Sequence, residues 1–390
     1  MTSQTRKASR IDYGLVLTLM LMCLVSLISI YSAQKTGQLD QNYVLKQVIW
    51  YIVGTGIIVV TIFFDSDQLK KLTWYLYGFG IVLLGFLIIA PDSIAHVTKG
   101  QKSWFTVPFM GTFQPSEIVK VFVILALART IVEHHDKYLI KTLKTDFWLL
   151  IKLGLITMLP LALIMQQPDL GTALVVVSIL LGIIFVSGIT WKLILPIFGG
   201  GSLIAGLVIY FVVWMPDILE KYLHVKTYQF NRIYSWLNPY EYKSDAGFQL
   251  INSLLAIGSG QTLGKGYNIS EVDIPERQTD FIFSMIGENF GFIGGSIVVS
   301  LFFMLIYHIT KASLETKNDF YSYICAGVIA MITFHVVENI GMTIGLLPIT
   351  GIPLPLISYG GSSLMGNMFA IGLIFSIRYH QKKYMFGSEK

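Results

Sequence analysis

Charged residues are scarce in this chain: they make up 13% of its 390 residues, against 54% hydrophobic residues. A soluble domain carries roughly a quarter charged residues. So few charges cannot cover the water-facing surface of a protein this size, which excludes an ordinary soluble domain. Uncharged runs of about 20 residues recur along the chain, and each is long enough to cross a bilayer as a helix. The sequence therefore predicts an integral membrane protein.

Cysteine is nearly absent as well. Cys23 and Cys325 are the only two, and both lie inside hydrophobic runs. The count excludes a disulfide framework and a cysteine metal site, and the two side chains are interpreted as small apolar residues. The formal net charge of +5 is modest, and no basic cluster carries interleaved aromatic residues. Nucleic acid is therefore not expected as a partner.

The hydrophobic runs predict an all-α integral membrane protein of ten transmembrane helices. Residues 1–390 form a single polytopic domain, with a large extracellular loop at 214–279 between helices 7 and 8. The first run is longer than the roughly 7–15 residues of a signal-peptide core, so we interpret it as a retained helix. The ten spans are predicted at 12–33, 47–64, 73–90, 115–132, 147–165, 170–188, 192–213, 280–308, 320–346 and 362–379.

The distribution of Lys and Arg predicts the orientation. With both termini in the cytoplasm, the inside segments hold seventeen of the 28 basic residues and the outside segments hold ten, with Lys120 inside a span. Six of those ten lie in the long loop, where the positive-inside rule has little force. This orientation places four polar segments on the outer face, at 91–114, 166–169, 214–279 and 347–361. We predict that the functional site lies there.

Several polar residues at this outer face have both a functional and an ordinary explanation. Lys99 and Trp104 lie in the 91–114 segment, where Trp104 could serve only as an interfacial anchor. Glu117 and Lys120 share one face of the fourth helix, where charges are costly and usually functional, and a mutual salt bridge is the alternative. Asp169 could cap the sixth helix and still place a carboxylate at the mouth of the bundle.

The long loop contains a glycine-rich stretch from Gly258 to Gly266. Its spacing does not fit a P-loop, because five residues separate Gly258 from Gly264, and a glycine, not Ser or Thr, follows Lys265. A flexible turn is the ordinary interpretation. Such a turn could also wrap a phosphate with its backbone amides.

The segment Pro275-Glu-Arg-Gln-Thr-Asp280-Phe-Ile-Phe opens the eighth helix. The Asp280 carboxylate could cap that helix or act as a general base in a desolvated mouth, and Arg277 could neutralise a phosphate. Further along, Pro and Gly interrupt the chain between 341 and 363, around Ser358, too densely for a regular helix. Non-helical backbone near membrane depth survives only where protein or a water-filled cavity satisfies it. His335 and Glu338, three apart, could bind an ion or relay protons, or could pair structurally within the bundle.

At these motifs the chain resembles the SEDS family of bacterial shape, elongation, division and sporulation proteins. The resemblance covers essentially the whole chain, and Pro275–Phe283 and Gly351–Ser363 are its most specific segments. The forms Gln167-Pro-Asp-Leu-Gly-Thr and Gly351-Ile-Pro-Leu-Pro are more similar to the elongation members than to the division members. Two positions depart from the family pattern: Gln261, where a third glycine is common, and Asn289, where a second glutamate often follows Glu288.

The resemblance implies a peptidoglycan glycosyltransferase that polymerises lipid II on the outer face of the bacterial cytoplasmic membrane during elongation and shape maintenance. Asp280 matches the family's essential acid, and Lys99, Trp104, Glu117, Lys120 and Asp169 match positions associated with its outward-facing cavity. Arg277 and Ser358 join them as predicted substrate-binding residues. The implied partners are lipid II, the growing lipid-linked glycan, a class B penicillin-binding protein and other membrane proteins of the elongation complex.

We expect Asp280 to take the proton from the acceptor sugar hydroxyl, which attacks the anomeric carbon of the growing chain while pyrophosphate leaves with inversion. Lys99, Lys120, Arg277 or a divalent cation, Mg or Mn, would offset the charge on that pyrophosphate. Asp280 could instead hold the cation. Two alternatives belong to other classes: a lipid II flippase, and a non-catalytic scaffold for a penicillin-binding protein.

Overall fold

The computed structural model describes residues 12–35, 42–95, 102–107, 111–215, 227–242 and 246–384. Most of these residues are helical, as the sequence predicts. The elements are α1 (Tyr13–Lys35), α2 (Tyr43–Ile62), α3 (Ser66–Ile89), β1 (Phe105–Val107), β2 (Gly111–Phe113), α4 (Pro115–Lys137), α5 (Leu143–Gln166), α6 (Leu170–Val186), α7 (Trp191–Trp214), α9 (Thr227–Leu237), α10 (Ala246–Ser259), α11 (Ile282–Glu315), α12 (Asp319–Thr343) and α13 (Gly361–Tyr384).

Seven of the described helices are long and apolar enough to cross a membrane: α1, α2, α3, α5, α7, α11 and α12. Large apolar side chains cover their outward faces, which no soluble bundle would leave in water. The multi-pass membrane class is therefore confirmed. The helices α4, α6 and α13 coincide with the remaining predicted spans, but α6 has only 17 residues and α4 carries several charges.

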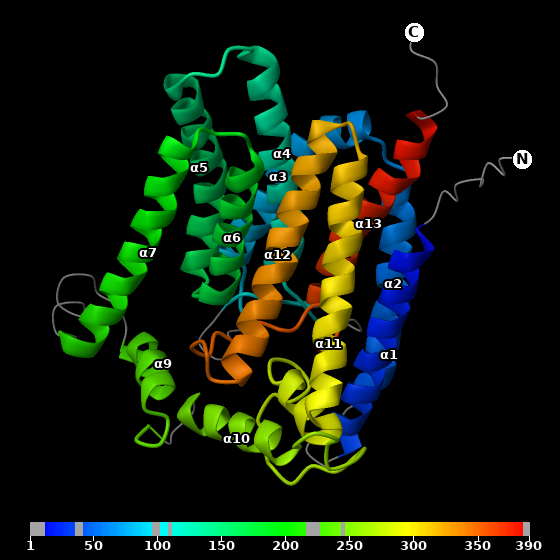
Figure 1. The fold of residues 1–390 in the computed structure, drawn as a ribbon, viewed down its shortest axis with the longest axis vertical. Coiled ribbons are helices and arrows are strands. Elements are labelled where there is room, and N and C mark those ends of the chain that lie inside the picture. The colour runs from blue at the N-terminus through cyan, green and yellow to red at the C-terminus, as the bar shows by residue number, and fades with distance from the viewer. Residues whose placement is uncertain are drawn as a thin grey trace, which may run out of the picture.

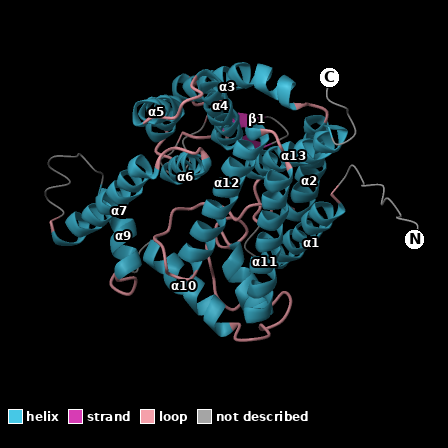
Figure 2. Ribbon diagram, turned by 45° about the horizontal axis from the view of Figure 1, so that its top comes forward, coloured by secondary structure: helices cyan, strands magenta, loops and turns pink. Residues whose placement is uncertain are grey.

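Helix α4 runs through the middle of the bundle (Figures 1 and 2). It packs against α3, α5, α6, α12 and α13, and every side chain from Val119 to Ala128 is buried. Protein, not lipid, therefore surrounds α4 on all sides over these turns. This environment is what allows the helix to carry Glu117 and Lys120 inside an otherwise apolar bundle.

Helices α9 and α10 lie across one end of the bundle, and we call this the capped end (Figure 1). The start of α1 and the end of α13 lie at the opposite end. Both cap helices fall within 214–279, which was expected to be a loop. The apolar side chains of Leu250, Ala256, Phe281, Met342 and Ile349 cluster where α10 meets α11 and α12. The cap is thus packed onto the bundle through a small core of its own.

Two further predictions differ from the structure, the start of the third helix and the form of the 91–114 segment. The third helix begins at Ser66, not at 73, because Asp65 and Gln68 form a capping box that starts the helix about two turns earlier. The 91–114 segment contains a short antiparallel hairpin, in which Thr106 of β1 pairs with Thr112 of β2. Phe105 anchors this hairpin against the end of α3. An all-α fold is therefore correct except for this hairpin.

Helix α11 is interrupted at Gly291, whose φ of 60° and ψ of −156° are not helical. Regular helical bonds would join the N–H groups of residues 292 and 293 to the carbonyls of 288 and 289. Instead, Lys265 N–H donates to the carbonyl of Glu288 (2.9 Å), and Phe292 N–H donates to that of Gln261 (2.9 Å). In the same way, Gly266 N–H donates to the carbonyl of Asn289, and Ile293 N–H donates to that of Thr262. Backbone groups of the glycine-rich stretch thus replace the helical hydrogen-bond partners at the interruption in α11, and we call this arrangement the splice.

The splice predicts that replacement of Gly264 by a larger residue lowers the stability of the protein. Its φ is +85°, and a Cβ there would lie 2.1 Å from the Asn289 carbonyl oxygen, which belongs to the backbone and cannot move aside. Gly264→Ala should therefore destabilise the protein by more than about 1 kcal/mol. The measurement is the thermal unfolding midpoint of the purified protein in detergent. Gly258→Ala is the matched control, because that helical position is open, and its midpoint should not fall.

Candidate functional site

A cavity of about 660 Å³ lies beneath the cap, between the helices. It is lined from α2, α4, α6, α9, α10 and α12, from the β1–β2 hairpin and from the segments on either side of Asp280 and Gly351. Four carboxylates face it: Glu117, Asp169, Glu276 and Asp280. Its other polar lining residues include Lys46, Trp104, Gln114, Arg232, Thr279, His335, Tyr359 and Ser362. The motifs that the sequence analysis predicted for the outer face therefore converge on one space.

Asp280 lies just before α11 and presents its half-buried carboxylate to the cavity. Gly351, from the segment that leads into α13, approaches it closely: a Cβ at Gly351 would lie 3.4 Å from Asp280 Oδ2. The φ of Gly351 is +78°, a conformation that side-chain-bearing residues rarely adopt. A glycine at this position thus meets two requirements, the backbone conformation and the space beside the carboxylate.

Glu117, Lys120 and His335 form a buried group at the inner wall of the cavity. The ammonium of Lys120, which is 2% exposed, donates to Glu117 Oε1 (2.9 Å) and lies 3.0 Å from His335 Nε2. His335 Nδ1 lies 2.7 Å from the Met331 carbonyl, which can only accept. Nδ1 therefore carries the proton, and Nε2 accepts from Lys120. The salt bridge considered at the sequence level exists, and Glu117 and His335 also line the cavity.

Asp169 serves as a cap and also lines the cavity. Its carboxylate accepts from the backbone amide of Thr172 (3.0 Å) and from the Thr172 hydroxyl (2.7 Å), so it caps α6. Its Oδ2 also accepts from Gln114 Nε2 (2.7 Å), which ties α6 to the start of α4. Trp104, half-buried before β1, lines the same cavity.

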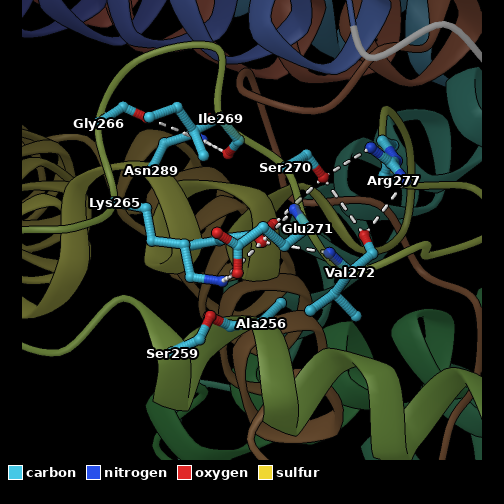
Figure 3. Close-up of polar contacts among 11 residues, drawn as sticks. Ala256, Ser259, Lys265, Gly266, Ile269, Ser270, Glu271, Val272, Arg277 and Asn289 are labelled. Atoms are coloured by element: carbon cyan, nitrogen blue, oxygen red, sulfur yellow. Dashed lines mark hydrogen bonds and ion pairs between the residues drawn. The ribbon is translucent and has the colours of Figure 1, made fainter.

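Three predicted site residues remain. One of them lies outside the described residues, and the other two do not line the cavity. Lys99 lies outside the described residues. Arg277 is 3% exposed and turns toward the segment before it, where it pairs with Asp273 (3.1 Å) and donates to Ser270 (2.9 Å), as Figure 3 shows in part. Ser358 is buried and bonds to backbone groups. Substrate contact by Arg277 and Ser358 stays a prediction, which their positions do not favour.

The sequence analysis gave no role to Lys46 and Arg232, although both line the cavity. Lys46, on the first turn of α2, was counted only as an outside charge. Arg232 comes from α9, whose place over the cavity could not be inferred, and its Nη1 lies 3.5 Å from the Thr350 carbonyl. The one available signal was that each cation stands at the predicted outer edge of a span or in the long loop.

The segment 265–272 is held against α11 by polar contacts (Figure 3). Glu288, fully buried, accepts from the backbone amides of Glu271 (2.9 Å) and Val272 (3.3 Å). Asn289 donates to the carbonyls of Gly266 and Ile269. The Lys265 and Gly266 amides are already bonded to α11 carbonyls, so they are not available to wrap a phosphate. A hydrogen bond to Glu271 raises the pKa of the Lys265 ammonium, with lesser help from Glu288.

A resident divalent cation would need more ligands than Asp280 alone. No group of three or more His, Cys, Asp or Glu side chains within the described ranges is arranged to hold a metal ion. The lining carboxylates Glu117 and Asp169 already bond to Lys120 and to Gln114 and Thr172. The donor set does not fit a built cation site, and we derive no step through a metal. The role of Mg or Mn stays a prediction.

These features define the class of protein: a multi-pass helical membrane protein whose polar, carboxylate-lined cavity lies beneath a helical cap. A family model described as "cell cycle protein", which joins FtsW, RodA and SpoVE, matches residues 10–383. The chain therefore belongs to this family, which is the SEDS family that its motifs resemble.

Individual relatives agree with this membership. The peptidoglycan glycosyltransferase RodA of Treponema pallidum is 32% identical over 96% of this chain and 99% of its own. The peptidoglycan glycosyltransferase MrdB of Escherichia coli is 35% identical over 76% of each chain. Among solved structures, a chain of a peptidoglycan synthase complex that coordinates polymerization and crosslinking is similar, with a TM-score of 0.74, 26% identity and coverage of 95% and 98%. RodA of Thermus thermophilus gives a TM-score of 0.66, with 26% identity and coverage of 94% and 96%.

Proposed function

We propose that this protein is a peptidoglycan glycosyltransferase that polymerises lipid II into glycan strands during cell elongation. The observation that carries the proposal is the cavity, which brings Asp280, Glu117 and Asp169 together inside an apolar bundle of a family that includes the peptidoglycan glycosyltransferases RodA and MrdB. A lipid-linked sugar has an apolar tail and a polar head, and such a bundle suits both. The direct test is glycan formation from labelled lipid II by the purified protein.

The proposed topology has ten spans, with both termini in the cytoplasm and the capped end outside. Ten long helices coincide with the ten predicted spans, and the described chain ends lie at one end of the bundle, as an even number of spans requires. The basic residues favour that end as the cytoplasmic one. The cavity then opens on the outer face, where the cell wall is built. Cysteine labelling from outside intact cells, at position 263 just after α10 and at position 314 in the last turn of α11, tests the orientation.

In the proposed mechanism Asp280 is the general base. Its carboxylate takes the proton of the acceptor sugar hydroxyl, and that oxygen forms a bond to the anomeric carbon of the growing chain. The bond from that carbon to the pyrophosphate breaks, and the pyrophosphate leaves with the electron pair from the opposite face, which inverts the configuration. General-base catalysis of this kind contributes about 10²–10⁴-fold.

Lys46 and Arg232 are the lining cations that we assign to the pyrophosphate groups. They line the cavity from α2 and α9, whereas Lys120 and Arg277 do not line it. A guanidinium offers several donors to phosphate oxygens in a fixed geometry. These two residues therefore replace Arg277 as the proposed source of positive charge.

Replacing Arg232 by Gln should raise the KM for lipid II about 10-fold or more, since a charge-assisted hydrogen bond contributes roughly 1.5–3 kcal/mol. The measurement is initial rate against lipid II concentration. Lys311→Gln, which removes an exposed charge at the opposite end, serves as the control and should leave KM unchanged. An Arg232→Gln protein with the KM of the wild type would remove Arg232 from the binding site.

A class B penicillin-binding protein is the proposed partner, together with other membrane proteins of the elongation complex. The support is the similarity to a chain of the solved synthase complex, which couples polymerization to crosslinking. Lipid II and the growing lipid-linked glycan are the proposed ligands of the cavity. Co-purification of the tagged chain with its penicillin-binding protein from native membranes tests the pairing.

A lipid II flippase is the second candidate, and the buried Lys120–Glu117–His335 group favours it, since transporters place ionisable groups inside the bundle. The glycosyltransferase is preferred because Asp280 and the cap gather the polar groups toward one end. Movement of lipid II across proteoliposomes, without polymer, is the result that would select the flippase.

A further inference from the structure

The short segment that carries Asp280 is held by three donors in a row. The carbonyl of Gln278 accepts from the Tyr359 amide (2.9 Å), and that of Thr279 accepts from the Ser358 hydroxyl (2.6 Å). The carbonyl of Asp280 itself accepts from Asn339 Nδ2 (2.7 Å). Three consecutive peptide groups are therefore fixed from outside their own segment.

Asn339 and Ser358 each also bind the segment that follows α12. The amide nitrogen of Asn339 donates a second time, to the carbonyl of Ile352 (2.8 Å), so both its N–H groups are used. The Ser358 hydroxyl accepts from the Leu354 amide (2.9 Å) while it donates to Thr279. Each side chain thus joins the backbone beside Asp280 to the irregular backbone between α12 and α13.

The orientation of the Asn339 amide is fixed by chemistry. Its two neighbours are carbonyl oxygens, which only accept, so the NH₂ group must face them. Its Oδ1 is buried and accepts no hydrogen bond from the described residues. The side chain therefore sits where its two donors are used and its acceptor is not. This arrangement is expected of a residue that holds two backbones together.

Neither residue lines the cavity: Asn339 is fully buried and Ser358 is 5% exposed. We propose, on the basis of the proposed function, that Asn339 and Ser358 are positioning residues that set the Asp280 carboxylate against the bound substrate through its backbone. They act on the rate of the chemical step and not on substrate binding. Ser358, predicted from the sequence as a substrate ligand, receives this role instead.

The test uses the purified full chain with its penicillin-binding partner and measures kcat and KM for polymerisation of lipid II. Ser358→Ala should lower kcat roughly 10–100-fold, since misplacement of a catalytic group by about 1 Å costs around 100-fold, and should change KM by less than about twofold. Ser358→Thr, which keeps the hydroxyl, should restore most of kcat. Asn339→Leu should reproduce the Ser358→Ala result.

Ser376→Ala is the matched control, because Ser376 is an equally buried serine that donates to a backbone carbonyl, that of Phe64, far from the cavity. Its kcat should remain that of the wild type. The decisive comparison adds Ser358→Ala to Asp280→Asn, with residual rates measured by long incubation with radiolabelled lipid II, because an ordinary gel assay would not detect them. If Ser358 acts through Asp280, adding Ser358→Ala should not lower the residual rate of Asp280→Asn any further. If Ser358 has an independent structural role, the added substitution should lower that rate again.

An unchanged kcat in Ser358→Ala, a loss that falls on KM, or an additive loss in the double variant would each overturn the positioning role. Those outcomes leave the proposed function standing if Asp280→Asn alone lowers the rate by about 10²–10⁴-fold. Full activity of Asp280→Asn would overturn both. Thermal unfolding of each variant shows that the rates are compared between folded proteins, and the conservative Ser358→Ala decides if Asn339→Leu does not fold.

Discussion

Asp280→Asn is expected to abolish glycan formation while leaving the protein folded. The substitution keeps the size of the side chain and removes its ability to take a proton. General-base catalysis contributes about 10²–10⁴-fold, so polymer should fall below detection in an ordinary gel assay. The carboxylate is half-buried at the cavity wall, and asparagine fills nearly the same space and can still accept a hydrogen bond, so stability should change little.

The assay combines the purified protein with its penicillin-binding partner, whose transpeptidase is blocked, and labelled lipid II. Glu271→Gln is the matched control, because this carboxylate lies in the same segment before α11 but is exposed and pairs with Lys265. It should polymerise normally. Long glycan from a folded Asp280→Asn protein would contradict the general-base role. If the wild type forms no polymer but moves lipid II across a bilayer, the protein is a flippase and not a glycosyltransferase.

Lys120→Met is expected to cause the largest loss of stability. It leaves the Glu117 carboxylate buried, 5% exposed, without its cation partner, and it leaves His335 Nε2 without its donor. Breaking a buried ion pair by removal of one partner typically costs about 3–5 kcal/mol. The measurement is the thermal unfolding midpoint in detergent, and the midpoint should fall well below that of the wild type.

The double variant Glu117→Gln with Lys120→Met separates the structural role of the pair from its functional one. Removal of both charges should recover much of the lost stability, because no unpaired charge remains in the bundle. Polymerisation should remain low, since Glu117 faces the cavity. Recovery of activity together with stability would show that the pair serves only the fold.

The helical membrane fold was predictable because its signal is long. A run of about 20 apolar residues marks a span whatever its neighbours do, and each predicted span coincides with a helix. Shorter signals failed. The capping box at Asp65 starts α3 earlier than the apolar run predicted. The cap helices α9 and α10 were predicted as loop, because an amphipathic segment of 11 or 14 residues is a weak pattern.

At the site, the motif segments identified which residues converge but not which way each side chain turns. Asp280 and Arg277 are three residues apart in one motif, yet one faces the cavity and the other pairs with Asp273. The direction depends on tertiary contacts that local sequence does not encode. Lys46 and Arg232 were missed for the same reason, since α2 and α9 lie far apart in the sequence and only the fold brings both to the cavity.

The splice in α11 also constrains how the protein is assembled. All its backbone bonds join residues about 20 to 30 positions apart, so they close within one local unit formed by α10, the glycine-rich stretch and α11. Contacts at such short separation form early, because little chain entropy is lost in closing them. This unit can therefore be complete before α12 and α13 leave the ribosome. The segment that carries Asp280 is then in place when the later helices arrive to fix it.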